Sequence, residues 1–380
     1  METFLTVFLL AVLALIFVYV FLDWRKRDKK GRQDPAVYIE GLRAMLSGHD
    51  ETAFARFRDV VAEDSGNIDA YIRLGDLLRK YNKADKALQV HKDLTLRQDI
   101  TRKEKRAVLE SLAEDYTALK DDRAAMLSYK ELLELEPNHG PGVRKLLEVQ
   151  ARLGNWEEAY QIKERLIKID REKSRAGLAI YKFFQGQTLY DQKKYHKSRI
   201  VFKEAISIDP GCVPAYIWIG DSYLAEDRLE DAATVWRKLI KAVPEEAHLV
   251  LGRLQKTLFD LGRFGEISDV CKEILEGSGK NLEAWLTLAD YHYKKGEYAL
   301  AIEHLNRAAD NYPDSYLPPL ELARLYLVTD EKQKLRELLD RLESGRESRE
   351  CEYLCRKCGH KSGTKLWLCP SCKAVDSFRR

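Results

Sequence analysis

A pattern of about 34 residues recurs along most of this 380-residue chain, and it is clearest in Val213–Pro244. In that stretch large apolar residues at helical spacing surround Gly220, a break follows at Ala225–Arg228, and a second run contains Ala232 and Trp236. Because side chains three and four positions apart share one face of a helix, the pattern predicts two short amphipathic helices joined by a tight turn. The two small residues let these helices approach each other closely.

The same spacing gives a series of repeat starts near Asp34, Ile68, Arg106, Gly140, Ala179, Val213, His248, Leu282 and Tyr316. Most repeats have glycine or alanine in the first helix and alanine or serine in the second. Leu147, Gln255 and Ile267 depart from this pattern, so the fourth and seventh repeats are the least regular. The alternative is an ordinary helical bundle with chance periodicity, which eight or nine repeats in register disfavour.

The unit resembles the tetratricopeptide repeat, a helix–turn–helix motif of about 34 residues. This resemblance predicts an all-α solenoid of about nine helix pairs over residues 34–346, in which each pair packs on its neighbours. Charged residues make up 33% of the chain and the formal net charge is +3, which fits solvated helix faces. No sequence-wide basic bias indicates nucleic acid as a partner.

The chain begins with 20 uncharged residues, Thr3–Leu22. As a helix they span about 30 Å, enough to cross a membrane once. Six Lys and Arg residues follow within 25–32, so the positive-inside rule places the N-terminus outside and the remainder in the cytoplasm. We expect a transmembrane anchor at 1–24 and a basic juxtamembrane linker at 25–33. A cleaved signal peptide is the competing interpretation, but it requires basic residues before the apolar run and a better cleavage site than Phe21–Trp24.

Stacked helix pairs form a concave groove lined mainly by first helices, and such grooves hold segments of partner proteins. The candidate partner-binding residues, by repeat position, are Arg73, Asp76, Arg79, Phe183, Gln187, Tyr190, Asp221, Asp290 and Tyr293. Each of them could instead be an aromatic residue of the inter-repeat core or a solvated charge. Gly277–Lys280 lacks the spacing of a phosphate-binding loop, and the array contains neither a nucleophile elbow nor a paired-histidine zinc motif. We therefore expect a binding protein and not an enzyme.

Four of the seven cysteines lie in the last 26 residues, as the two pairs Cys355/Cys358 and Cys369/Cys372. Each C-x-x-C pair forms a tight turn, and two facing turns direct four thiolates at one ion. This spacing predicts a metal-binding ribbon at 347–380 that folds around zinc, with iron possible. We expect Tyr353, Leu366, Trp367 and Leu368 to cover the metal.

Two alternatives concern the details of this site. The C-x-x-C-G and C-P-x-C turns resemble those of rubredoxin, which binds iron, but the short spacer and Lys373 in place of a second glycine argue against a complete rubredoxin fold. A register that pairs Cys351 with Cys355 is disfavoured because Cys358 would then lose its pair.

An N-terminal anchor, a repeat array and a Y-x-C-x-x-C-G…W-x-C-P-x-C tail together resemble the lipopolysaccharide assembly protein B family of Gram-negative bacteria. The tail motif is Tyr353, Cys355, Cys358, Gly359, Trp367, Cys369, Pro370 and Cys372. The family's metal ligands correspond to the four cysteines of the two pairs. Val375 stands where the family usually has an aromatic residue.

The resemblance implies a non-enzymatic adaptor at the inner membrane, with its N-terminus in the periplasm and its bulk in the cytoplasm. It also implies partners: a membrane-bound AAA+ metalloprotease, its client, the deacetylase that commits carbon to lipid A, and other lipopolysaccharide assembly proteins. Two other functions stay open at this point. One is an iron-dependent redox protein that uses the four cysteines, and the other is a nucleic-acid-binding protein that uses the basic tail.

Overall fold

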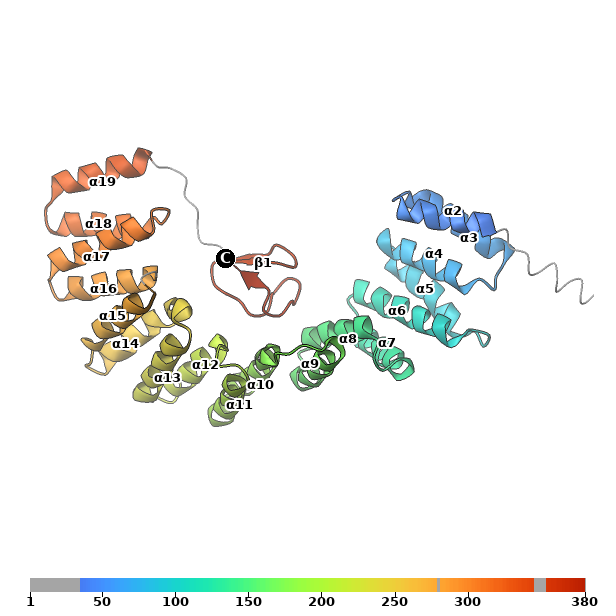
Figure 1. Cartoon of the computed structure of the whole chain (residues 1–380), viewed down its shortest axis with the longest axis horizontal. Coiled ribbons are helices and arrows are strands. Elements are labelled where there is room, and N and C mark those ends of the chain that lie inside the picture. Colours follow the sequence, from blue (N-terminus) through green and yellow to red (C-terminus); the bar gives the residue numbers. More distant parts are fainter. Residues whose placement is uncertain (1–34, 279–280, 345–352, 380) are drawn as a thin grey trace, which may run out of the picture. The chain divides into compact units, whose positions relative to one another are not determined.

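The computed structural model describes residues 35–278, 281–344 and 353–379, and the chain divides into two compact units at Val149–Gln150 (Figure 1). The predicted anchor and basic linker lie at 1–34, outside the described residues, so both stay predictions. Among the helices that the structure describes, none is both long enough and apolar enough to cross a membrane.

In the described residues of the first unit, from Pro35 to Val149, the regular elements are all helices. Six of them lie wholly inside it, and a seventh contains the boundary: α2 (Pro35–Leu46), α3 (Asp50–Glu63), α4 (Ile68–Lys80), α5 (Ala84–Thr95), α6 (Arg102–Ala118), α7 (Asp122–Leu135) and α8 (Gly140–Leu153). Consecutive helices pack as pairs, and first helices of successive pairs also touch, as α4 and α6 do.

The second unit continues the same pattern and ends in a small sheet described below. Its helices are α9 (Trp156–Asp170), η1 (Ala176–Leu178), α10 (Ala179–Asp191), α11 (Tyr195–Ile208), α12 (Val213–Leu224), α13 (Leu229–Ala242), η2 (Pro244–Leu249), α14 (Leu251–Asp260), α15 (Glu266–Ser278), α16 (Leu282–Lys294), α17 (Tyr298–Asn311), α18 (Leu317–Val328) and α19 (Lys332–Ser344). The predicted all-α repeat solenoid with a small cysteine ribbon is confirmed.

The close contact between the two helices of a pair depends on the small residue of the first helix. A Cβ atom added to Gly220 would lie 2.2 Å from Nε1 of Trp236, and one on Gly186 would lie 2.6 Å from the Phe202 ring. Both large residues are fully buried. In each case the large side chain comes sixteen residues after the glycine, on the second helix of the same pair.

Two repeats begin differently from the sequence-based expectation. The third repeat was expected to start at Arg106, but α6 starts at Arg102, where Thr101 and Glu104 form a capping box. The seventh was expected to start at His248. There the chain forms the 3-10 helix η2, which begins at Pro244, and then the short helix α14.

A first prediction concerns the glycine contact. Gly220→Ala should destabilise the second unit by about 1–3 kcal/mol, because the new methyl group overlaps the Trp236 ring. Gly252→Ala is the matched control: it also lies in a first helix, but no atom is within 4 Å of an added Cβ. Its stability should be unchanged or raised by up to about 1 kcal/mol. Thermal unfolding followed by circular dichroism measures both, and equal transition temperatures for the two variants would contradict this interpretation.

Candidate metal centre

The C-terminal ribbon is a three-stranded antiparallel sheet that brings its two cysteine turns together. Its strands are β1 (Tyr353–Cys355), β2 (Lys361–Ser362) and β3 (Phe378–Arg379), in the order β2-β1-β3. Leu354 pairs with Lys361 on one side and with Arg379 on the other. A bridge between Leu368 and Val375 closes the second turn.

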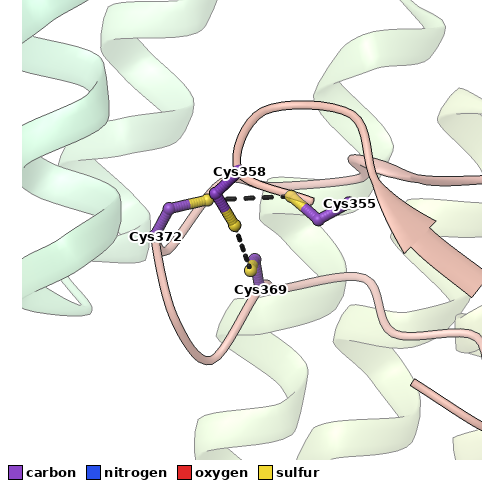
Figure 2. A group of neighbouring side chains, drawn as sticks. All are labelled: Cys355, Cys358, Cys369 and Cys372. Atoms are coloured by element: carbon purple, nitrogen blue, oxygen red, sulfur yellow. Dashed lines mark hydrogen bonds between the residues drawn. The ribbon is translucent and has the colours of Figure 1, made fainter. Parts of the chain in front are cut away.

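The four sulfur atoms of Cys355, Cys358, Cys369 and Cys372 all lie within 4.8 Å of one another (Figure 2). The Cys355–Cys372 and Cys358–Cys369 sulfur pairs are 3.7 and 3.6 Å apart. A tetrahedron with zinc–sulfur bonds of about 2.3 Å has edges of about 3.8 Å. The donor set therefore fits a tetrahedral ion, and a four-cysteine rubredoxin-like metal-binding site is present.

The two cysteine turns have the same backbone structure. In the first, Gly359 N–H donates to Cys355 O and Cys355 N–H donates to His360 O, at 2.8 and 3.0 Å. In the second, Lys373 N–H donates to Cys369 O and Cys369 N–H donates to Ala374 O, both at 2.9 Å. Gly359 and Lys373 both have positive φ, 72° and 56°. Lys373 therefore occupies the conformation that glycine has in the first turn, and its presence is no obstacle to a rubredoxin-like turn.

The Cys355 thiol ionises more readily than an ordinary cysteine because of its contact with Ser377. The Ser377 hydroxyl lies 3.1 Å from Cys355 Sγ, and this hydrogen bond lowers the pKa of Cys355 to about 6. Because a thiolate and not a thiol binds a metal, this contact favours ligation at neutral pH.

The apolar cover of the site differs in part from the expectation. Tyr353 and Phe378 are buried beside Cys355 and Cys369, and Leu366 packs against them. Trp367 and Leu368 were expected here as well, but they pack on the apolar clusters of the repeats. Both residues lie on the side of the second cysteine turn that contacts the repeats.

The ribbon packs on the repeats of its own unit. Tyr353 Oη lies 3.2 Å from His248 Nε2, and Lys365 forms an ion pair with Glu246; both repeat residues belong to η2. Trp367 packs against the clusters around Trp236 and Phe183. In place of the predicted repeat start at His248, the structure has η2, which contacts the ribbon. The interrupted pattern at this point was the sequence signal for it.

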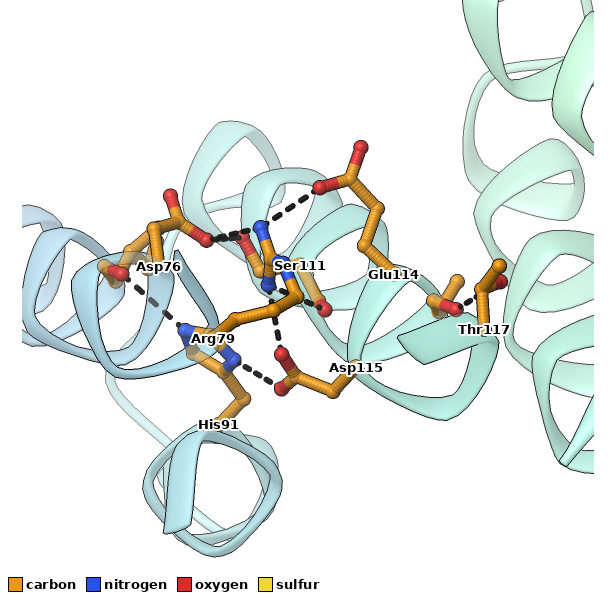
Figure 3. A network of polar contacts seen from close by, with 9 residues as sticks. Asp76, Arg79, His91, Ser111, Glu114, Asp115 and Thr117 are labelled. Carbon is orange, nitrogen blue, oxygen red and sulfur yellow. Dashed lines mark hydrogen bonds and ion pairs between the residues drawn. The ribbon is translucent and has the colours of Figure 1, made fainter. Parts of the chain in front are cut away.

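In the first unit, the candidate groove residues Asp76 and Arg79 belong to a polar network between two repeats (Figure 3). The Arg79 guanidinium donates to the carboxylates of Asp76, Glu114 and Asp115, each at 2.7 Å, and it is 18% exposed. Its charge is therefore already paired. Arg73 pairs with Asp69 one turn away, at 3.3 Å.

His91 joins this network from the second helix. Its Nδ1 lies 2.5 Å from Asp115 Oδ2, and its Nε2 lies 3.2 Å from Ile72 O. Both ring nitrogens therefore lie within hydrogen-bond distance of an oxygen atom. Gly75 permits this arrangement, because a Cβ there would lie 2.2 Å from Nε2. These charges hold two repeats together.

In the second unit, the candidate groove residues have four kinds of surroundings. Phe183 is 1% exposed and stacks on Phe202, so its assignment to an open groove is corrected to the core. Gln187 is partly exposed. Tyr190 packs edge-on against Trp218, and Asp221 pairs with Arg253 at 3.2 Å. Asp290 and Tyr293 line a cavity of about 470 Å³.

Comparison with known proteins supports the repeats and the ribbon separately. Residues 353–380 match the family model "Rubredoxin metal binding domain". Residues 180–212, 215–245 and 282–315 match models of the tetratricopeptide repeat. The repeat prediction and the predicted cysteine ribbon thus each have independent support.

Relatives named "Lipopolysaccharide assembly protein B" match nearly the whole chain. The one from Escherichia coli K12 is 23% identical and the one from Haemophilus influenzae is 25% identical; each alignment covers 98% of this chain and 97% of the relative. A tetratricopeptide repeat protein from Parabacteroides merdae superposes with a TM-score of 0.35 at 14% identity, over 77% of this chain and 98% of that one. The resemblance to the assembly protein is thus confirmed.

A second prediction tests the ligand set. Cys369→Ser should release the metal, because a buried thiolate is removed from a four-thiolate site, and the ribbon should become sensitive to protease. Cys351→Ser, whose position is outside the described residues, is the control and should keep one ion per chain. Elemental analysis and limited proteolysis measure the two effects. Metal loss in the control, or full occupancy in Cys369→Ser, would overturn the assignment.

A third prediction uses the two equivalent turns. Lys373→Gly should strengthen metal binding, because a side chain with left-handed backbone costs about 1 kcal/mol that glycine avoids. Gly359→Ala should weaken it by a similar amount, and no steric clash contributes because no atom is within 4 Å of the added Cβ. Titration against a competing chelator measures both, and shifts of the same sign would contradict this account.

Proposed function

We propose that this homologue of lipopolysaccharide assembly protein B is a non-enzymatic scaffold that limits lipopolysaccharide synthesis at the bacterial inner membrane. In this proposal it presents the deacetylase that commits carbon to lipid A to a membrane-bound AAA+ metalloprotease. It also gathers other lipopolysaccharide assembly proteins. The observation that carries the proposal is the match to relatives of that name over 98% of the chain.

The physical support comes from the arrangement of repeats and ribbon. A solenoid presents a long surface on which partner segments lie, and tetratricopeptide repeats are typical protein-binding modules. The ribbon contributes a metal-dependent contact to the same unit through Tyr353, Lys365 and Trp367. Metal binding would therefore stabilise the repeats around η2 as well as the ribbon.

We further propose that Thr3–Leu22 anchors the scaffold with the repeats in the cytoplasm. Confinement to the protease's membrane raises the effective concentration of client and protease without any new contact. This rise in effective concentration requires that the scaffold and the protease lie in the same membrane.

A second candidate function is an iron-dependent electron carrier, which the rubredoxin match favours. The visible spectrum separates the two. A colourless zinc-bound protein supports the scaffold, whereas a red protein that is reduced and reoxidised reversibly supports the carrier.

A fourth prediction tests the scaffold directly. The full chain, the protease and the deacetylase are reconstituted in lipid vesicles, and deacetylase degradation is followed with time. The full chain should accelerate degradation by about tenfold or more, and a version without residues 1–24 should lose most of this acceleration, because it no longer shares the membrane. Trp367→Ala should also reduce it, because the ribbon loses its apolar contact with the repeats. Degradation at an unchanged rate with and without the full chain would refute the proposal.

A further inference from the structure

The two faces of the ribbon's sheet differ in burial. Along β1 the buried residues Tyr353 and Cys355 alternate with Leu354, which is 43% exposed. Successive residues of a strand point to opposite faces, so Leu354 lies on the face opposite the cysteine site. Because Tyr353 contacts His248 of η2, the side with Leu354 is turned away from that contact. We call this side of the sheet the outer face.

Cations flank Leu354 on both sides of the outer face. Lys361 of β2 and Arg379 of β3 are its register partners, and both are exposed. Residues directly opposite each other in antiparallel strands point to the same face. Neighbouring strands lie about 4.8 Å apart, so the two cation positions lie about 10 Å apart with Leu354 between them. The outer face therefore has an apolar centre between two positive charges.

A third cation lies further along the same strand. Arg356 N–H donates to Ser377 O at 2.9 Å, which continues the pairing of β1 with β3 by one residue. Arg356 comes two positions after Leu354, so strand alternation places it on the outer face, and it is exposed. Cations of all three segments of the sheet thus surround one exposed leucine.

The positive charge of the outer face is not balanced by acids of the ribbon. Residues 353–379 contain six Lys or Arg and one acid, Asp376, which lies 3.4 Å from Arg379. Only Lys365 of the six cations pairs with a printed acid of the repeats, Glu246 of η2. A divalent ion with four thiolates has a net charge of about −2, but these ligands lie under the opposite face. The outer face therefore favours an anionic ligand.

The type of anion follows from the apolar centre and from the places of the aromatic rings. Single-stranded nucleic acid typically stacks its bases on exposed aromatic side chains. Among the ribbon residues that the structure describes, Tyr353 and Phe378 are buried, and Trp367 packs on the repeats. An exposed leucine between cations instead suits a protein segment that carries acids around an apolar side chain.

The register of the sheet also sets the spacing of such a segment. In an extended chain, side chains two positions apart point to the same side and lie about 6.6 Å apart. An apolar residue over Leu354 therefore has acids two positions before and after it about 2 Å beyond the positions of Lys361 and Arg379. The long Lys and Arg side chains cover this difference.

We propose that the outer face of the ribbon binds an extended acidic segment of a partner protein, in which Asp or Glu stands two positions before and two positions after a large apolar residue. The apolar residue packs on Leu354, and the two carboxylates pair with Lys361 and Arg379. This inference rests on the proposed scaffold function and gives the chemistry of one segment that the scaffold holds.

The test uses the full metal-bound chain in detergent micelles and a fluorescein-labelled peptide with the core Glu-Ser-Leu-Ser-Glu. Fluorescence anisotropy measures its affinity beside that of a twin with Lys in place of both Glu. The acidic peptide should bind at least about tenfold more tightly, because the twin brings like charges together. Lys361→Glu should weaken its binding by about fivefold. Lys203→Glu, which makes the same charge change at an exposed position of α11, is the matched control and should leave the affinity unchanged.

The decisive variant combines Lys361→Glu with Arg379→Glu, and it should reverse the preference so that the basic twin binds more tightly. A general loss of folding cannot produce this reversal, and elemental analysis checks that the variant keeps its metal. No reversal in a metal-bound variant, or equal weakening by Lys203→Glu, would overturn the proposal. Tighter binding of a short single-stranded oligonucleotide than of the acidic peptide would also overturn it and assign the face to nucleic acid.

The vesicle degradation assay separates this proposal from the scaffold function. Acceleration of degradation by a chain that does not distinguish the two peptides would leave the scaffold in place and refute the acidic-segment site. Selective binding of the acidic peptide without any acceleration would support the site and refute the scaffold.

Discussion

Close approach of two helices over a residue without a side chain is the contact on which the repeats depend. Gly186 meets Phe202 and Gly220 meets Trp236, each sixteen residues later and each at a distance that leaves no room for a Cβ. The large ring fills the space between the helices of its own pair and reaches the clusters shared with its neighbours. The stability of each repeat is thus tied to that of the next.

In the first unit, one of these glycine contacts is made by a polar side chain. There the large residue opposite Gly75 is His91, which cannot be buried without partners for both ring nitrogens. Asp115 from the following repeat supplies one of them and also binds Arg79. Removing one member of such a buried ionic network typically costs about 3–5 kcal/mol. Charges that resemble a solvated groove in the sequence are therefore part of the packing between repeats.

Local pattern was enough to predict the helix pairs, the cysteine ribbon and its donor set, because these depend on residues close together in sequence. The seventh repeat shows where local pattern fails. Gln255 and Ile267 break the repeat pattern there, and η2 contacts the ribbon, which lies about 100 residues further on. For Phe183 the sequence left groove and core both open, and its burial shows that the core alternative is right. The pairing of Arg79 was not predicted, since it depends on side chains from another helix.

The contact between His248 and Tyr353 joins residues that are 105 positions apart. The ribbon follows all the described repeats in the sequence, so its contact surface on η2 is synthesised before the segment that covers it. A chain in which the ribbon is unfolded exposes the apolar surface of the repeats that Trp367 otherwise covers.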